Sequence, residues 1–153
     1  MSSYVPALLR RAIAQRADSL YQYCLILDED TYAGCQVEHI IAEKHGGITH
    51  ESNLAFACAY CNRAKGTDIA TLVPASGAIS RLFNPRSDIW SHHFRINGVH
   101  IEGITEIGIC TVVLLGFNRE SRIAERTVLA EIGRYPSPAA LNRTKSQHRI
   151  GDN

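Results

Sequence analysis

A group of polar side chains between Glu38 and Lys65 has the residue types needed to hydrolyse a phosphodiester bond. Glu38 and His39 are adjacent, Asn53 lies fourteen residues after His39, and Asn62 and Lys65 follow Asn53 by nine and twelve residues. Such hydrolysis needs a base that activates water near neutral pH and a cation that stabilises the charge developing at phosphorus. A histidine can act as the base, and Glu and Asn supply the hard oxygen ligands that Mg²⁺ or Mn²⁺ prefers.

The segments that carry these residues predict two strands followed by a helix. Residues 36–41 predict a strand that includes Glu38 and His39, and the apolar run 54–58 is short enough to be a buried strand. Residues 60–65 predict a short helix, which Gly66 ends. Neighbouring side chains on an ideal strand point to opposite faces, so Glu38 and His39 can take separate roles here only if the strand twists or bulges.

The order of these residues resembles the HNH endonucleases. The motif is Glu-His, Gly-Gly, Asn-Leu and Cys-x-x-Cys-Asn-x-x-Lys-Gly over about residues 20–68, and a weaker likeness to a bacterial subset of the family continues through Leu82 to Phe94. The resemblance implies an α+β protein with a ββα-metal core, in which a histidine on the first strand faces a metal ion. It also implies metal-dependent hydrolysis of DNA, with double-stranded DNA as the favoured substrate.

The resemblance also implies a role for each residue of the motif. His39 matches the general base that deprotonates the attacking water, and Glu38 matches a metal ligand. Asn62 stands at the last position of the motif, where some members of the family have His and others Asn, and both can bind the cation. With oxygen donors from Glu38 and Asn62, we expect Mg²⁺ or Mn²⁺ rather than a catalytic Zn²⁺.

Three further residues have less specific patterns. Asn53 matches the middle position of the motif, whose amide braces the loop and orients the base, although Asn before a strand is also a common turn former. Lys65 and, with lower preference, Arg63 match positions that can neutralise a phosphate of bound DNA. Both can equally be a solvated helix end that favours the helix dipole.

The cysteines match only part of a structural zinc site. Cys58 and Cys61 have the spacing of half such a site, and related proteins have a second pair upstream. Here Tyr21 stands in place of the first upstream cysteine, so Cys24, Cys58 and Cys61 supply three of the four ligands that a closed site needs. Either Cys35 supplies the fourth ligand or the site has been lost and the thiols pack as small hydrophobes. We expect loss.

The rest of the chain predicts an N-terminal helix and a C-terminal extension of the same domain. We expect one domain over residues 1–135, with its core at about 20–68, an extension at 69–135 and a disordered basic tail at 136–153. The predicted elements outside the motif are an amphipathic helix at about 6–20, strands at 24–27 and 109–115, irregular structure at 67–93 anchored by Trp90 and Phe94, a hairpin turning at Asn97-Gly98, and a helix at about 119–132 capped by Asn118.

Composition narrows the function only in broad terms. The net charge is +1, but thirteen of the sixteen basic residues are Arg, which suits contacts to phosphate. No segment is long enough to span a bilayer, and the five cysteines come without a secretory signal, so we expect a cytoplasmic protein with reduced thiols. Two other functions stay open, namely a non-catalytic DNA-binding module on the same scaffold and a structural zinc-binding interaction protein. Cleavage of both strands needs two active sites or two visits, which leaves a homodimer open.

Overall fold

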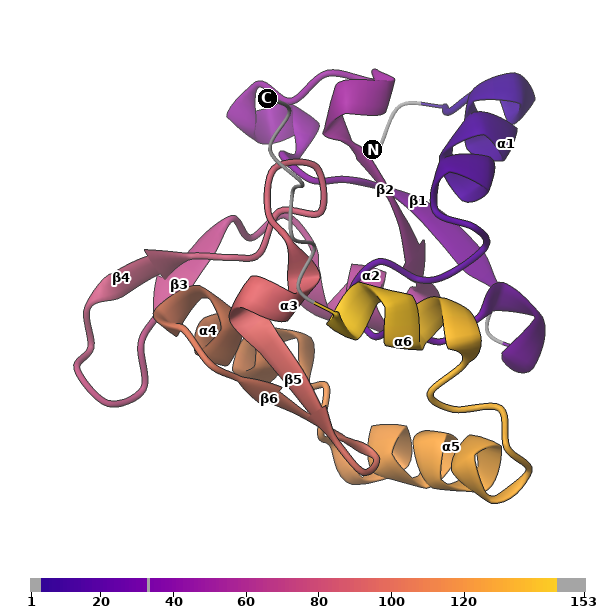
Figure 1. Cartoon of the computed structure of the whole chain (residues 1–153). Helices are drawn as coiled ribbons and strands as arrows, with labels where there is room; N and C mark the ends of the chain where they lie inside the picture. Colours follow the sequence, from indigo (N-terminus) through magenta and orange to yellow (C-terminus); the bar gives the residue numbers. More distant parts are fainter. Residues whose placement is uncertain (1–3, 33, 146–153) are drawn as a thin grey trace, which may run out of the picture.

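Short strands pair as three separate antiparallel hairpins in the computed structural model, which describes residues 4–32 and 34–145 (Figure 1). The pairs are β1 (Cys35–His39) with β2 (Leu54–Cys58), β3 (Ala70–Leu72) with β4 (Ile79–Arg81), and β5 (Phe94–Asn97) with β6 (His100–Gly103). The α-helices are α1 (Ala7–Arg16), α2 (Ala59–Lys65), α3 (Trp90–His93), α4 (Glu106–Leu115), α5 (Glu120–Glu131) and α6 (Pro138–Thr144), and the 3-10 turns are η1 (Asp28–Asp30), η2 (Glu43–His45) and η3 (Glu51–Asn53). This confirms the predicted α+β class, and no helix among the described residues is long and apolar enough to cross a membrane.

The β1–β2 hairpin and α2 form the ββα unit that the sequence predicts. The register pairs His39 at the end of β1 with Leu54 at the beginning of β2. Every residue of β2 is buried, as expected for an apolar run without alternation. α2 follows β2 directly, and the Cys58 sulfur accepts a hydrogen bond from the Cys61 amide (3.3 Å) in its first turn. Strand and helix are therefore joined without a loop.

Aromatic side chains from the second half of the chain complete the core around this unit. Trp90 Nε1 donates to the Tyr23 carbonyl oxygen (2.9 Å), and the Tyr135 hydroxyl donates to the Cys24 carbonyl oxygen (3.1 Å). The rings of Trp90 and Phe94 pack with their centroids 5.0 Å apart. Both residues are buried, which confirms their predicted anchoring role.

The strand predicted at residues 109–115 is wrong, because this segment belongs to α4. A short apolar run does not by itself distinguish a buried strand from a buried helix. The residues at the two ends of this segment favour the helix. The Thr105 side chain caps its N-terminus by accepting a hydrogen bond from the Gly108 amide (3.1 Å), and Gly116 ends it with a positive φ of 63°. Thr105 is a favourable N-cap residue and Gly a favourable C-terminal one.

The strand predicted at residues 24–27 is also wrong. Leu25 has a positive φ of 59°, and pairing at this place is a single bridge between Leu20 and Leu27. A positive φ in a residue other than Gly, Asn or Asp interrupts an extended strand. The segment is a tight loop that is buried up to Ile26, and it brings Tyr23 and Cys24 into the core.

The predicted hairpin at β5–β6 is confirmed, but its turn lies one residue later than expected. Asn97 pairs with His100, so Gly98 and Val99 form the turn. Asn118 does not cap α5, whose N-cap residue is Arg119 without a side-chain hydrogen bond. Instead the Asn118 side chain binds the amide and the carbonyl oxygen of Ile101 (3.0 and 2.8 Å), which fixes β6 to the start of α5.

Part of the segment expected to be disordered is a helix. α6 begins after Ser137, whose hydroxyl accepts from the Ala140 amide (3.1 Å), and Pro138 stands in its first turn. These are two favourable helix-start residues, and burial of Ala140 holds the helix on the body of the protein. The rest of the predicted tail, residues 146–153, lies outside the described residues. The region 67–93 contains the β3–β4 hairpin and α3 rather than being irregular throughout.

Candidate active site

Glu38, His39 and Asn62 line one cavity of about 320 Å³. β1 carries Glu38 and His39 at its end, and α2 carries Asn62 in its middle. Arg10 of α1 and Lys44 of η2 also line the cavity, so its walls include two cations. The structure therefore brings together the predicted base and both predicted metal ligands.

His39 is held through one of its two ring nitrogens. Its Nε2 lies 2.8 Å from the Thr49 hydroxyl oxygen, and the residue is half-buried. A neutral histidine that accepts a proton from water at Nδ1 must carry its own proton on Nε2. Thr49 can accept a hydrogen bond from that Nε2–H group, and this leaves Nδ1 as the nitrogen for water.

Asn53 braces the loop that follows β1. Its Oδ1 accepts from the Ile41 amide (2.9 Å), and its Nδ2 donates to the carbonyl oxygens of Ile41 (2.9 Å) and Ile48 (3.0 Å). The loop is closely packed at this point, since a side-chain carbon on Gly47 would lie 1.7 Å from the Ile41 carbonyl oxygen. Asn53 is buried, so its geometry supports a bracing function rather than contact with substrate.

Glu38 and Lys65 form an ion pair in the protein interior. Lys65 Nζ lies 2.6 Å from Glu38 Oε1 and also donates to the Ile40 carbonyl oxygen (2.9 Å). The two side chains are only 3% and 2% exposed. Burial raises the pKa of Glu38, and the Lys65 ammonium opposes this shift. The Tyr23 hydroxyl also lies near Glu38 and favours its ionised form, without the alignment of a hydrogen bond.

This ion pair corrects the expected role of Lys65. A lysine that is almost fully buried and held by Glu38 cannot neutralise a phosphate of DNA at the surface. Its position one turn after Asn62 on α2, directly against β1, explains why it points inward. Arg63 is exposed, so it keeps access to a bound phosphate.

Glu38 and Asn62 carry the kind of oxygen donors that a hard divalent cation prefers. Glu38 Oε2 is buried and has no hydrogen-bond partner within residues 4–32 and 34–145. Such an orphaned carboxylate oxygen is unfavourable unless a further positive charge or donor satisfies it. Asn62 lines the same cavity and offers a second oxygen donor.

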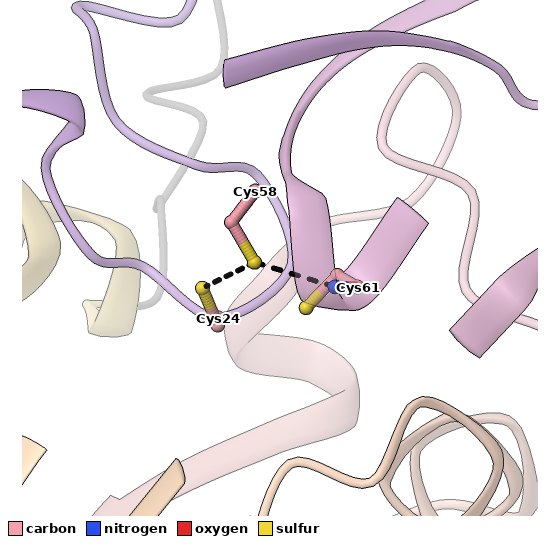
Figure 2. A group of neighbouring side chains, drawn as sticks. All are labelled: Cys24, Cys58 and Cys61. Carbon is pink, nitrogen blue, oxygen red and sulfur yellow. Dashed lines mark hydrogen bonds between the residues drawn. The ribbon is translucent and has the colours of Figure 1, made fainter. Parts of the chain in front are cut away.

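Three cysteines form a second cluster on the inner side of the ββα unit (Figure 2). The sulfurs of Cys24, Cys58 and Cys61 all lie within 4.8 Å of one another, and all three are buried. The Cys24 thiol donates to the Cys58 sulfur (3.9 Å). Figure 2 shows the three side chains directed toward one another from the loop before β1, the end of β2 and α2.

The described residues do not complete a closed structural zinc site at this cluster. The Tyr21 hydroxyl donates to Asp28 Oδ1 (2.7 Å), and Cys35 is exposed and not part of the cluster. Arg122 of α5 contacts this cluster, and its Nη2 donates to the Cys58 sulfur (3.5 Å). The hydrogen bond from Cys24 lowers the pKa of Cys58, and the Arg122 charge acts in the same direction. A guanidinium cannot act as a metal ligand, so three donors are present where four are needed.

Two of these partners were missed at the sequence level. Thr49 follows the Gly46-Gly47 pair but has no spacing that marks it as a partner of His39. Arg122 is 64 residues from Cys58, and it stands among other charged residues of α5, so the sequence gives no signal of a role at the cysteines. Its guanidinium also lies over the Tyr60 ring, 4.9 Å from the centroid.

Comparison with known proteins finds one family that part of the chain resembles. Residues 22–68 match the family model described as HNH endonuclease. No curated protein and no solved structure matches the chain. The matched segment contains β1, β2, α2 and each of the residues at the candidate site from Glu38 to Asn62. Over residues 22–68 the chain is therefore similar to the HNH endonuclease family.

Proposed function

We propose that this protein is a metal-dependent endonuclease that hydrolyses phosphodiester bonds in DNA, with His39 as the general base. The observation that carries the proposal is the shared cavity of His39, Glu38 and Asn62, which combines one base with two oxygen donors. The family points to nuclease or DNA-binding function in general. We propose both the catalytic activity and double-stranded DNA as its substrate.

In this mechanism each residue has a separate task. His39 takes the proton of the attacking water at Nδ1, while Thr49 holds Nε2 and with it the ring orientation. Glu38 Oε2 and the Asn62 amide oxygen would hold Mg²⁺ or Mn²⁺, which neutralises charge on the phosphate and the leaving oxygen. Lys65 keeps the Glu38 carboxylate ionised and in place. Arg63 contacts a neighbouring phosphate from the exposed side of α2.

The cysteine cluster has a structural role in this proposal. Cys24, Cys58 and Cys61 pack without zinc, and the Arg122 guanidinium donates a hydrogen bond to the Cys58 sulfur. Zinc is then not needed for the fold.

One observation favours a second candidate, a DNA-binding module without catalysis. Lys65 already neutralises part of the Glu38 charge, which weakens the attraction of this carboxylate for a divalent cation. Cleavage of plasmid DNA in the presence of a divalent metal separates the two candidates.

The test is cleavage of supercoiled plasmid by the wild-type protein and His39→Ala, with Mg²⁺, Mn²⁺, Zn²⁺ or a chelator. The matched control is His50→Ala, since His50 is exposed and its side chain bonds within its own turn to Ser52. We expect nicking with Mg²⁺ or Mn²⁺ that His50→Ala retains and His39→Ala loses. Plasmid binding without cleavage under any metal, equal in all three proteins, would replace the enzyme by the DNA-binding module.

A further inference from the structure

Arg86, outside the HNH segment, has a guanidinium without an acceptor. Its Nε is buried and makes no hydrogen bond within the described part of the chain. The residue follows Pro85 in the loop between β4 and α3 and is only partly exposed. A guanidinium has five N–H donors, and leaving a buried one unmatched is unfavourable. An acceptor from a bound ligand could therefore pair with the Arg86 guanidinium.

Two more arginines lie near Arg86 and increase the positive charge. Burial, together with the charges of Arg16 and Arg143, lowers the pKa of Arg86 to about 10, and Tyr23 acts in the opposite direction. Arg16 ends α1 and donates to the carbonyl oxygens of Glu51 (2.8 Å) and Leu54 (2.7 Å), which do not neutralise it. Three like charges are thus brought together from three distant parts of the sequence.

The acidic groups near these arginines compensate little of their charge. Arg143 of α6 lies 3.9 Å from an Asp18 carboxylate that is 78% exposed, and the Glu51 carboxylate is near Arg16. Asp88 lies two residues from Arg86, but both of its oxygens are bound by Arg81 (2.7 and 2.9 Å). An exposed ion pair contributes little, so the three arginines keep a net positive charge.

A cavity adjoins part of this cluster: Arg143 and Pro85, the neighbour of Arg86, line it, whereas Arg16 and Arg86 do not. It has a volume of about 170 Å³ and is lined by Pro85, Asp88, Arg143 and Lys145 among others. α6 lies against α3 (Figure 1), and the cavity is lined by Pro85 of the loop before α3 and by Asn142 and Arg143 of α6. The arginines are connected to the candidate active site along α1, because Arg10 of the same helix lines the cavity of His39.

We propose that Arg16, Arg86 and Arg143 form a binding site for the phosphate backbone of DNA, which holds the duplex while a neighbouring phosphodiester bond lies at His39. This proposal rests on the proposed nuclease function, and it adds the place on the protein where the duplex is bound. A run of phosphates is the partner that suits an arginine cluster of this kind, because each guanidinium can bind two phosphate oxygens. The site uses α6 and the loop of Arg86, so the extension rather than the HNH segment would position the substrate.

The experiment measures the affinity of Arg86→Gln and Arg143→Gln for a fluorescent DNA duplex across a range of salt concentrations. The matched control is Arg95→Gln, an arginine paired with Glu102 on the β5–β6 hairpin. We expect each of the two variants to lose about tenfold in affinity, as for one charge-assisted contact, and to reduce the slope of log K against log salt by about 1. The Tm of Arg86→Gln should not fall, because the substitution relieves repulsion and breaks no hydrogen bond.

The outcomes separate this proposal from the proposed function. If Arg86→Gln and Arg143→Gln bind with wild-type affinity and slope while the wild-type protein nicks plasmid, the arginine site is overturned and the nuclease stands. If both lose affinity while no protein cuts DNA, the site stands and the nuclease fails. Displacement of the duplex by inorganic phosphate, at an ionic strength at which chloride has no effect, would assign the site to a small anion and overturn the backbone assignment.

Discussion

Replacing Lys65 with methionine removes the charge that faces Glu38 in the interior and keeps a side chain of similar length. In the wild-type protein Nζ and Oε1 are 2.6 Å apart, and Lys65 also donates to the Ile40 carbonyl oxygen. Removing one partner of a buried ion pair costs about 3–5 kcal/mol, because the other charge stays buried without compensation. For a domain of this size we expect a fall in Tm of about 6–20 °C.

The loss of stability in Lys65→Met should depend on pH with a definite sign. Burial raises the pKa of Glu38 and Lys65 lowers it, so removal of Lys65 raises it further. A carboxyl group with a raised pKa in the folded state stabilises the fold fully below its unfolded pKa, and this contribution is lost as pH rises through the folded pKa. Lys65→Met should therefore be least destabilised near about pH 4 and most destabilised near about pH 8.

Urea denaturation at both pH values, with a chelator present, measures this free energy of unfolding. Lys44→Met is the control because Lys44 is exposed, and Glu38→Gln combined with Lys65→Met should recover most of the loss since no charge is then buried. A loss below about 1 kcal/mol, or the same loss at both pH values, would show that Glu38 is not a buried charge that depends on Lys65.

Two further predictions concern the base and the cysteines. Thr49→Val removes the partner of His39 Nε2, and we expect the nicking rate to fall about tenfold with unchanged DNA affinity, measured by single-turnover cleavage against gel-shift titration; an unchanged rate would exclude Thr49 as a positioning residue. The protein purified without added metal should contain far less than one zinc per chain, and a chelator should leave its Tm unchanged. One tightly bound zinc whose removal lowers the Tm would contradict the proposal that the three cysteines pack without zinc beside Arg122.

Local patterns predicted the ββα unit well because its elements are short and bounded by distinct residues. The apolar run of β2 and Gly66 after α2 mark the boundaries directly, and the order of Glu38, His39 and Asn62 in the motif implied a common site. The structure brings all three to one cavity. The local patterns failed where burial decides, as at residues 109–115, since an apolar run suits a buried helix as well as a strand.

The role of Lys65 could not be predicted for a physical reason. A sequence shows that a lysine stands near the end of a helix, but not whether that face of the helix packs against a strand. Here α2 lies on β1, and the carboxylate of Glu38 offsets the unfavourable burial of the ammonium. The contacts of Arg122 and Arg86 could not be predicted for a related reason. Both arginines interact with groups that are distant in the sequence.

The hydrogen bonds from Trp90 and Tyr135 to the carbonyl oxygens of Tyr23 and Cys24 bear on how the HNH segment could be used outside this chain. The buried loop that they bind has backbone oxygens that the segment itself does not satisfy. Residues 22–68 transplanted alone onto another scaffold would expose those oxygens and the apolar rings beneath them. A graft would therefore need the tryptophan and the tyrosine to be supplied by its new host.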